Sequence, residues 1–107
     1  MPKELLGEFE HHVLLTVLRL GEESYSVPIV TELEERTDRA VAAAAVYIAL
    51  RRLEAKGLAE SELRAAAADQ TGRSRRYFRV TEDGAKQLRE SRRRFDRLWE
   101  GLDPAIG

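Results

Sequence analysis

The sequence predicts a mainly α-helical chain with one small β-hairpin, arranged as a winged helix-turn-helix and followed by a long last helix. Three observations predict this fold. Apolar residues recur at helical spacing in three segments before Gly57. Two strand-like segments follow, separated by a loop that contains arginines. A new amphipathic segment then begins at Thr81.

The first helix is predicted over Glu8–Leu20. Gly21 is expected to end it, because glycine readily adopts the left-handed conformation found just beyond many helices. Four apolar residues lie three or four positions apart and so share one face of this helix: Phe9, Val13, Val17 and Leu20.

The second helix is predicted from Ser26 to about Arg36. The Ser26 hydroxyl can cap its first turn, and Pro28 is tolerated in that turn because its missing N–H would have no helical partner. The turn to the next helix is expected over residues 37–40. The residues expected to face inward are Val27, Val30 and Leu33.

The third helix is predicted over about Ala42–Lys56 and ends at Gly57. Because alanine cannot accept a hydrogen bond from the free N–H groups of a first turn, a helix that starts at Ala42 has no side-chain cap. Alternatively, Asp38 or Thr37 caps the helix from further back and the helix starts earlier. The inward stripe is expected to consist of Ala45, Val46, Ala49, Leu50 and Leu53.

The hairpin is predicted from two strands, Leu58–Arg64 and Arg75–Val80, joined by a long loop over residues 65–74. Thr81 is expected to cap the last helix. Acidic residues 82 and 83 fall in its first turn, where the helix dipole favours negative charge. One face of this helix carries the apolar residues Leu88, Phe95, Leu98, Trp99 and Leu102.

Length and composition exclude several classes of protein. A chain of 107 residues is one domain by length, and it contains no cysteine that could form disulfides or thiolate metal sites. No apolar run approaches the ~18 residues that span a membrane, so we expect a cytoplasmic protein with no membrane partner. His11 and His12 point about 100° apart on a helix and cannot share one metal ion. With no nucleophile–base pair or carboxylate pair recognisable, we expect neither an enzyme nor a cofactor.

The charge is unevenly distributed along the chain. The net charge is −1, but residues 1–50 hold 4 Lys/Arg and 9 Asp/Glu, whereas residues 51–100 hold 14 Lys/Arg and 9 Asp/Glu. Such separation can steer a DNA duplex toward one face of an acidic protein. The alternative is that arginines on the last helix are only a solvated face.

The third helix is the candidate recognition helix of this fold. Arginine can pair with guanine or bind phosphate, and a tyrosine hydroxyl can donate to phosphate. The alternative for Tyr47 is a half-buried ring whose hydroxyl reaches the domain surface. The outward residues expected to contact DNA are Ala43, Ala44, Tyr47, Arg51 and Arg52.

The predicted hairpin carries a second group of candidate DNA contacts. Arg73, Arg75 and Arg76 lie near its tip, and Arg64 lies on the facing strand. Arginines clustered in this way suit phosphate or minor-groove contact. The alternative is ordinary surface charge on a loop.

Two motifs in the chain resemble those of the PadR family of transcriptional regulators. The family pattern IY-x-x-L-x-R-L-E-x-x-G-L corresponds here to Val46–Leu58, and G-R-x-R-x-Y-Y-R-L-T-x-x-G corresponds to Gly72–Gly84. The motifs are specific as a pair and weak singly, and the resemblance extends over Leu6–Leu102. It implies a bacterial homodimeric regulator, most simply a repressor, that binds double-stranded DNA at a palindromic operator.

The chain departs from the family pattern where the third helix begins. Four successive alanines, residues 42–45, stand where the family has Ser or another polar residue followed by Gly-Thr or similar. Ser26 is a milder change, since glycine is usual in the family after the preceding tyrosine. Small side chains allow close approach to a groove but offer no base-reading donors, so specificity is expected to rest on few side chains or on DNA shape.

The end of the last helix is expected to pack on a second subunit. Phe95 and Trp99 are four residues apart on one face, and a lone winged helix domain offers this face little to pack on. The resemblance implies dimerisation through the first and last helices. The alternative is that the face folds back on the first helix of its own chain. The expected interface residues are Phe9, Val13, Leu88, Phe95, Leu98, Trp99 and Leu102.

The chain therefore divides into a DNA-binding part, residues 1–81, and a dimerisation helix, residues 82–107, within one compact domain. A small aromatic effector would find its pocket between the two last helices near Trp99, since aromatic walls suit flat apolar ligands. Alternatively, Trp99 belongs only to the dimer core. The rival function is a protein-interaction module that does not bind DNA, with the acidic first half of the chain as its surface.

Overall fold

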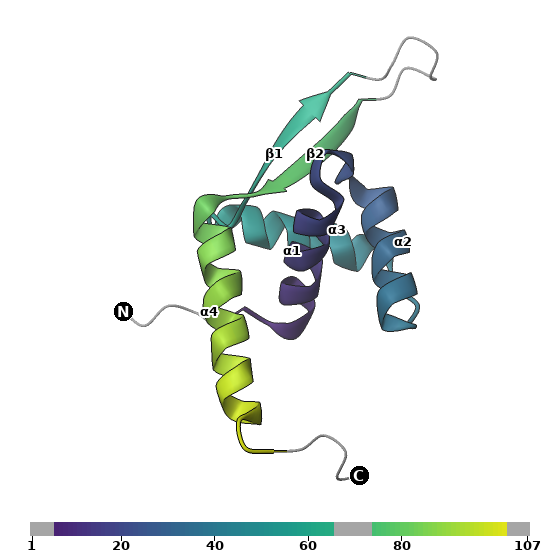
Figure 1. Cartoon of the computed structure of the whole chain (residues 1–107). Helices are drawn as coiled ribbons and strands as arrows, with labels where there is room; N and C mark the ends of the chain where they lie inside the picture. The colour runs from purple at the N-terminus through teal and green to yellow at the C-terminus, as the bar shows by residue number, and fades with distance from the viewer. Residues whose placement is uncertain (1–5, 66–73, 103–107) are drawn as a thin grey trace.

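The computed structural model describes residues 6–65 and 74–102 and confirms the predicted fold class. These residues form four α-helices, one short 3₁₀ helix and a two-stranded antiparallel hairpin (Figure 1). In chain order the elements are α1 (Glu8–Leu20), the short 3₁₀ helix η1 (Gly21–Glu23), α2 (Ser26–Thr37), α3 (Ala43–Ala55), β1 (Ala59–Arg64), β2 (Arg75–Val80) and α4 (Glu82–Trp99).

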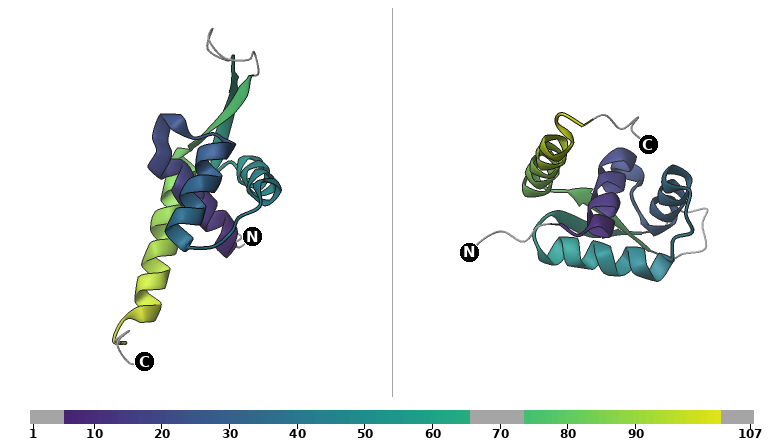
Figure 2. Two further views of the ribbon diagram at one scale, coloured as in Figure 1. Left: turned by 90° about the vertical axis from the view of Figure 1, so that its right-hand side faces the viewer. Right: turned by 90° about the horizontal axis from the view of Figure 1, so that it is seen from below.

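Helix α1 occupies the centre of the molecule. It lies between α4 and α2, and α3 crosses one side of it, as the view from below shows (Figure 2). The hairpin extends from one end of this helical body. Helix α4 runs away from the hairpin, and its C-terminal half projects beyond the other helices (Figure 1).

One apolar core joins α1, α2, α3, the hairpin and the start of α4. Residues from every one of these elements are almost completely buried in it: Val13, Leu14, Val17, Ile29, Leu33, Val46, Ala49, Leu50, Leu53, Ala59, Phe78 and Leu88. Two residues predicted to face inward do not. Val27 is 67% exposed, and Ala45 is also exposed. Ile29, rather than Val27, is the core residue of the first turn of α2, because each residue of offset turns a helix face by about 100°.

The helix ends follow the predicted signals with one exception. Gly21 ends α1 at φ 59°, and Gly57 follows α3 at φ 77°, both in the region that favours glycine. Ser26 does not cap α2, because it is already the first helical residue and Tyr25 holds the capping position without a side-chain hydrogen bond. Asp38 ends α2 in the left-handed conformation, which asparagine and aspartate tolerate better than most residues.

The hairpin pairs β1 with β2 in a register that runs from Ala59 opposite Val80 to Arg64 opposite Arg75. The Phe78 N–H donates to the carbonyl of Ser24 over 2.8 Å, which ties β2 to the segment before α2. Since successive residues of a strand point to opposite faces, adjacent hairpin residues serve different surfaces.

Helix α4 begins at a close contact with the end of the α3–β1 connection. As predicted, Thr81 caps it, since the Gly84 N–H donates to Thr81 Oγ1 over 3.0 Å. The Thr81 hydroxyl also donates to the Gly57 carbonyl over 2.7 Å. Gly84 is buried against Leu58, and a Cβ atom there would lie 2.1 Å from the Leu58 carbonyl oxygen. Only glycine fits this corner.

Candidate nucleic-acid interface

The outward side of α3 carries the predicted recognition residues. Ala43, Ala44, Tyr47, Arg51 and Arg52 are all exposed, and 48% of the Tyr47 surface is accessible. Ile48, which was not selected from the sequence, is 52% exposed on the same helix. The exposed side chains are therefore small and apolar at the N-terminal end of α3 and basic toward its C-terminal end.

The first turn of α3 has no side-chain cap. Ala42 holds the capping position in an extended conformation, at φ −76° and ψ 130°. Neither alternative residue caps the helix, because Thr37 donates its hydroxyl to the Leu33 carbonyl within α2 and Asp38 ends that helix. The connection is held instead by the Val41 N–H, which donates to a carboxylate oxygen of Glu34 over 3.0 Å.

A chain of three hydrogen bonds joins α3 to the hairpin. Arg51 Nη1 donates to Glu54 Oε1 over 3.0 Å. The Ser61 hydroxyl of β1 donates to the other carboxylate oxygen, Glu54 Oε2, over 2.6 Å. Arg76 Nη1 of β2 donates to the same Ser61 oxygen over 3.0 Å. We call this set the Glu54 relay. It links two candidate DNA contacts, Arg51 and Arg76.

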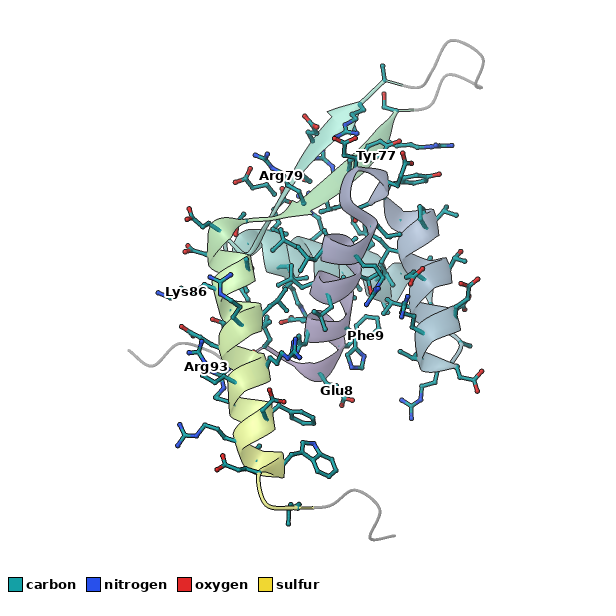
Figure 3. The ribbon with its side chains drawn as sticks, viewed as in Figure 1. Glu8, Phe9, Tyr77, Arg79, Lys86 and Arg93 are labelled. Atoms are coloured by element: carbon teal, nitrogen blue, oxygen red, sulfur yellow. The ribbon has the colours of Figure 1, made fainter. Side chains whose placement is uncertain are left out.

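The other face of the hairpin is held by a stack of rings and guanidinium groups. Arg64 lies over the Tyr77 ring at 4.2 Å from its centroid, and Arg75 lies over the Tyr25 ring at 4.5 Å. The two ring centroids are 5.2 Å apart. Figure 3 shows Tyr77 on the side of the hairpin next to η1. The stack attaches the hairpin to the segment before α2 through cation–π contacts.

The hairpin arginines are thus divided between two faces. Arg64 and Arg75 are opposite each other in the register and belong to the ring stack, whereas Arg76 points to the face of the Glu54 relay. From the sequence alone, we expect one cluster, because these arginines are close together in the predicted hairpin. Arg73 lies outside the described residues.

Two hairpin arginines are paired with carboxylates. Arg64 contacts Glu62 at 2.9 Å, and Arg79 contacts Glu60 at 2.5 Å. The hydrogen bond and charge of Glu60 raise the pKa of the Arg79 guanidinium above its usual value. Both pairs are exposed, so neither is expected to add much to stability.

The end of α4 presents an apolar surface. Phe95, Leu98, Trp99 and Leu102 are 60%, 73%, 45% and 59% exposed, and the Phe95 and Trp99 rings meet edge to face with centroids 6.4 Å apart. On α1, Leu15 and Leu18 are exposed too and were not selected from the sequence. They lie three residues apart and so share one side of α1. We call these six residues the apolar patch.

Two residues expected at a dimer interface belong to the chain's own core instead. Val13 is completely buried and Leu88 is 6% exposed, so neither offers surface to another subunit. Phe9, the remaining expected residue, is partly exposed near the start of α1 (Figure 3). The apolar stripes of α1 and α4 were predicted correctly, but at Val13 and Leu88 they pack on the chain's own core and not on a second subunit.

Two hollows lie on the surface of the described residues, and Leu18 of the apolar patch lines the first of them. One, of about 470 Å³, is bordered by the end of α1 and by the charged hairpin residues Glu60, Glu62, Arg64 and Arg79. The other, of about 630 Å³, lies between the start of α1 and the Ala45, Ile48 and Arg52 side of α3. Neither of these two hollows is lined by a residue of α4.

The two histidines are adjacent residues of α1, and the pKa of the first is shifted. Partial burial lowers the pKa of His11 below its usual value, and the nearby charges of His12 and Arg94 lower it further. Within residues 6–65 and 74–102, no group of three or more His, Asp or Glu side chains could hold a metal ion.

None of the helices in the same described part of the chain is long and apolar enough to cross a membrane.

Comparison with known proteins gives a consistent result. Residues 14–90 match the sequence model described as the transcriptional regulator PadR-like family. A search of curated proteins found no significant match.

Three solved structures resemble the chain over most of its length. A PadR-like transcription factor from Bacteroides fragilis is 21% identical, with a TM-score of 0.73 over 88% of this chain and 85% of that one. A PadR family regulator from Clostridium difficile is 20% identical, with a TM-score of 0.72 over 92% and 99%. A PadR family regulator from Eggerthella lenta is 29% identical, with a TM-score of 0.67 over 89% and 82%.

Proposed function

Since the chain belongs to the PadR-like family of transcriptional regulators, we propose that it acts as a homodimeric repressor that binds a palindromic DNA operator. The family places it among DNA-binding regulators rather than enzymes. The repressor role, the dimer and the operator symmetry are our proposal. We further propose that residues 1–81 form the DNA-binding part and residues 82–107 the dimerisation part.

The observation that carries the DNA-binding proposal is the joint presentation of α3 and the hairpin. The outward side of α3 is exposed, and the Glu54 relay connects it to the hairpin arginine Arg76. In a winged helix, such a helix enters the major groove while the hairpin lies beside the backbone. Tyr47, Arg51 and Arg52 are the side chains of α3 that would contact bases or phosphates, with Ala43 and Ala44 against the groove wall.

The alanine-rich start of α3 limits direct base reading. Three successive exposed alanines, residues 43–45, supply no side-chain donor or acceptor to a base edge. Discrimination between sequences would then depend on Arg51 and Arg52 together with DNA shape. The hairpin arginines would contribute mainly phosphate contacts, which position the protein without reading sequence.

The apolar patch supports the dimer. Six apolar side chains on α1, on α4 and just beyond the end of α4 are about half exposed or more in the single chain, and exposed apolar surface of this kind commonly marks a protein interface. An α1–α4 interface would cover Leu15 and Leu18 together with Phe95 and Trp99. A two-fold dimer would present two copies of α3 to successive half-sites. A small flat aromatic effector, if the repressor has one, would bind where the two α4 helices meet near Trp99.

Titration of a mixed-sequence DNA duplex at several salt concentrations tests the DNA-binding proposal. The expected result is a logarithm of affinity that falls linearly with the logarithm of salt concentration, with a slope of about 0.9 per phosphate contact. Sedimentation on the same preparation should give a dimer. An absence of salt-dependent binding would favour the rival protein-interaction role, for which the acidic residues of α2 would be the surface.

A further inference from the structure

We infer that Glu54 is a positioning residue for DNA discrimination, acting through Arg51 and Arg76 rather than by touching DNA. The inference rests on the proposed DNA-binding function. It assigns a role to a carboxylate that would be an unfavourable choice on a DNA-facing surface if affinity alone mattered, since a negative charge near phosphates weakens binding.

The geometry distinguishes Glu54 from an ordinary surface ion pair. Each carboxylate oxygen has its own donor: Arg51 on α3 and Ser61 on β1. The Glu54 side chain is 28% exposed and that of Arg51 is 50% exposed, so the carboxylate lies between the helix and the hairpin while the guanidinium remains accessible. Isolated exposed pairs contribute little, but a carboxylate that is bonded to two elements fixes their relative position.

Ser61 extends the same link to the second strand. Its hydroxyl donates to Glu54 and accepts from Arg76, so one oxygen joins a carboxylate on α3 to a guanidinium on β2. Arg76 is thereby held on the α3 side of the hairpin, whereas its neighbour Arg75 is held on the other side by the Tyr25 ring. The separation between the Arg51 and Arg76 guanidinium groups is therefore set by the relay.

A fixed separation matters for discrimination more than for affinity. A guanidinium reads guanine only when its donors are aligned with two acceptors, whereas a phosphate can be contacted in many orientations. If the relay is broken, both arginines remain positively charged and can still bind phosphates, but Arg51 is no longer aligned with a base edge. We therefore expect a broken relay to reduce the preference for the best sequence and to leave backbone binding intact.

The test compares two dissociation constants for each variant at one salt concentration. The first is for a duplex recovered from a random pool by selection with the wild-type chain, and the second is for a mixed-sequence duplex. Their ratio measures discrimination. Ser61→Ala changes no charge and should lower the ratio about tenfold, the value of one well-aligned base contact. Ser61→Thr keeps the hydroxyl and should restore it.

Glu54 variants separate charge from position. Glu54→Ala should lower the discrimination ratio and strengthen binding to the mixed-sequence duplex, since a negative charge is removed as well as the link. Glu60→Ala is the matched control, because Glu60 is also a hairpin-side carboxylate paired with an arginine, and that arginine lies on β2 rather than on α3. It should strengthen mixed-sequence binding slightly and leave the ratio unchanged.

Each outcome bears on one proposal. If wild-type protein binds DNA with the expected salt dependence but Ser61→Ala and Glu54→Ala keep the wild-type ratio, the positioning role is wrong and the proposed function stands. If wild-type protein shows no salt-dependent binding, the proposed function fails. Thermal melts of every variant accompany the titrations, because a purely structural role would lower the melting temperature without changing the ratio measured on the folded fraction.

Discussion

The hairpin and the C-terminal half of α4 both extend from the same core, but the chain supplies neighbours to only one of them. On the hairpin, the Glu54 relay and the stack of Tyr25 and Tyr77 hold the arginines in place. Near the end of α4, Phe95 and Trp99 contact each other and stay about half exposed. Among the described residues, the hairpin side chains therefore have partners in their own chain, whereas the apolar side chains at the end of α4 stay exposed.

The difference follows from what each surface has to meet. A DNA backbone is strongly charged and hydrated, so arginines that contact it gain from being held in advance but can remain solvated while unbound. Exposed aromatic rings have no such partner in water and gain free energy only when another apolar surface covers them. The hairpin arginines are therefore held in advance for a charged ligand, and the proposed dimer would cover the apolar end of α4.

The largest expected effect tests the second region. Replacing both Phe95 and Trp99 by alanine should weaken dimerisation by several kcal/mol, since truncation of a buried Phe or Trp costs about 3–5 kcal/mol. Sedimentation equilibrium over a concentration series measures the change. Val27→Ala is the control, because Val27 is a similarly exposed apolar residue on α2, outside the apolar patch. A wild-type chain that sediments as a monomer at micromolar concentration would remove the dimer from the proposal.

Gly84 joins the two regions and gives the next largest effect. Gly84→Ala would place a Cβ 2.1 Å from the Leu58 carbonyl oxygen and 2.9 Å from a methyl group of Val80, so the start of α4 must shift. We expect the free energy of unfolding to fall by about 1–3 kcal/mol, as for other overpacked sites. Chemical denaturation measures it. Gly7→Ala is the control, since a Cβ there meets nothing within 4 Å; equal decreases in both variants would contradict the close packing.

How much of this contrast the sequence could predict depends on the range of the interactions. Helix bounds came out well because periodicity and end signals are local: α1 and β2 were predicted to the residue, and Thr81 was identified as a cap. The apolar character of α4 was also local. The sequence could not predict whether Leu88 packs on its own chain or on another one, because a helical stripe does not identify the surface that covers it.

The polar contacts of the hairpin could not be predicted for a similar reason. The relay joins Glu54 to Ser61 and then to Arg76, fifteen residues further along, and the stack joins Tyr25 to Tyr77, which are far apart in the chain. These pairs depend on the strand register and on how α3 meets β1. The sequence motifs contain Glu54 and Tyr77, but nothing in their spacing assigns partners to them.

The hairpin arginines provide the third test, now on the first region. Replacing both Arg75 and Arg76 by alanine should weaken binding to all sequences, and the salt slope should fall by about 0.9 for each phosphate that is no longer neutralised. Fluorescence anisotropy at several salt concentrations measures the slope. Arg92→Ala on α4 removes an exposed arginine away from the hairpin and should leave it unchanged. An unaltered slope in the double variant would exclude the hairpin from the DNA interface.

The smallest expected effect concerns the first turn of α3, the proposed recognition helix, which has no side-chain cap. Ala42 holds the capping position with extended backbone angles, so a serine there could accept a hydrogen bond from an N–H of the first turn. Ala42→Ser should raise the free energy of unfolding by about 0.5–2 kcal/mol. The added hydroxyl would also lie at the N-terminal end of α3, where it should tighten DNA binding modestly.

Thermal melts of Ala42→Ser and of two controls decide whether the cap is the cause. Ala44→Ser places the same side chain inside the helix, where serine is slightly worse than alanine, so it should be neutral or mildly destabilising. Asp38→Ala should have little effect on α3, because Asp38 ends α2 and does not cap the next helix. A gain from Ala44→Ser equal to that from Ala42→Ser would show that the effect does not come from capping. A large decrease in stability from Asp38→Ala without a gain from Ala42→Ser would place the start of α3 at least one turn earlier. The first turn of α3 would then have a side-chain cap from its own chain, just as the hairpin arginines have partners in their own chain.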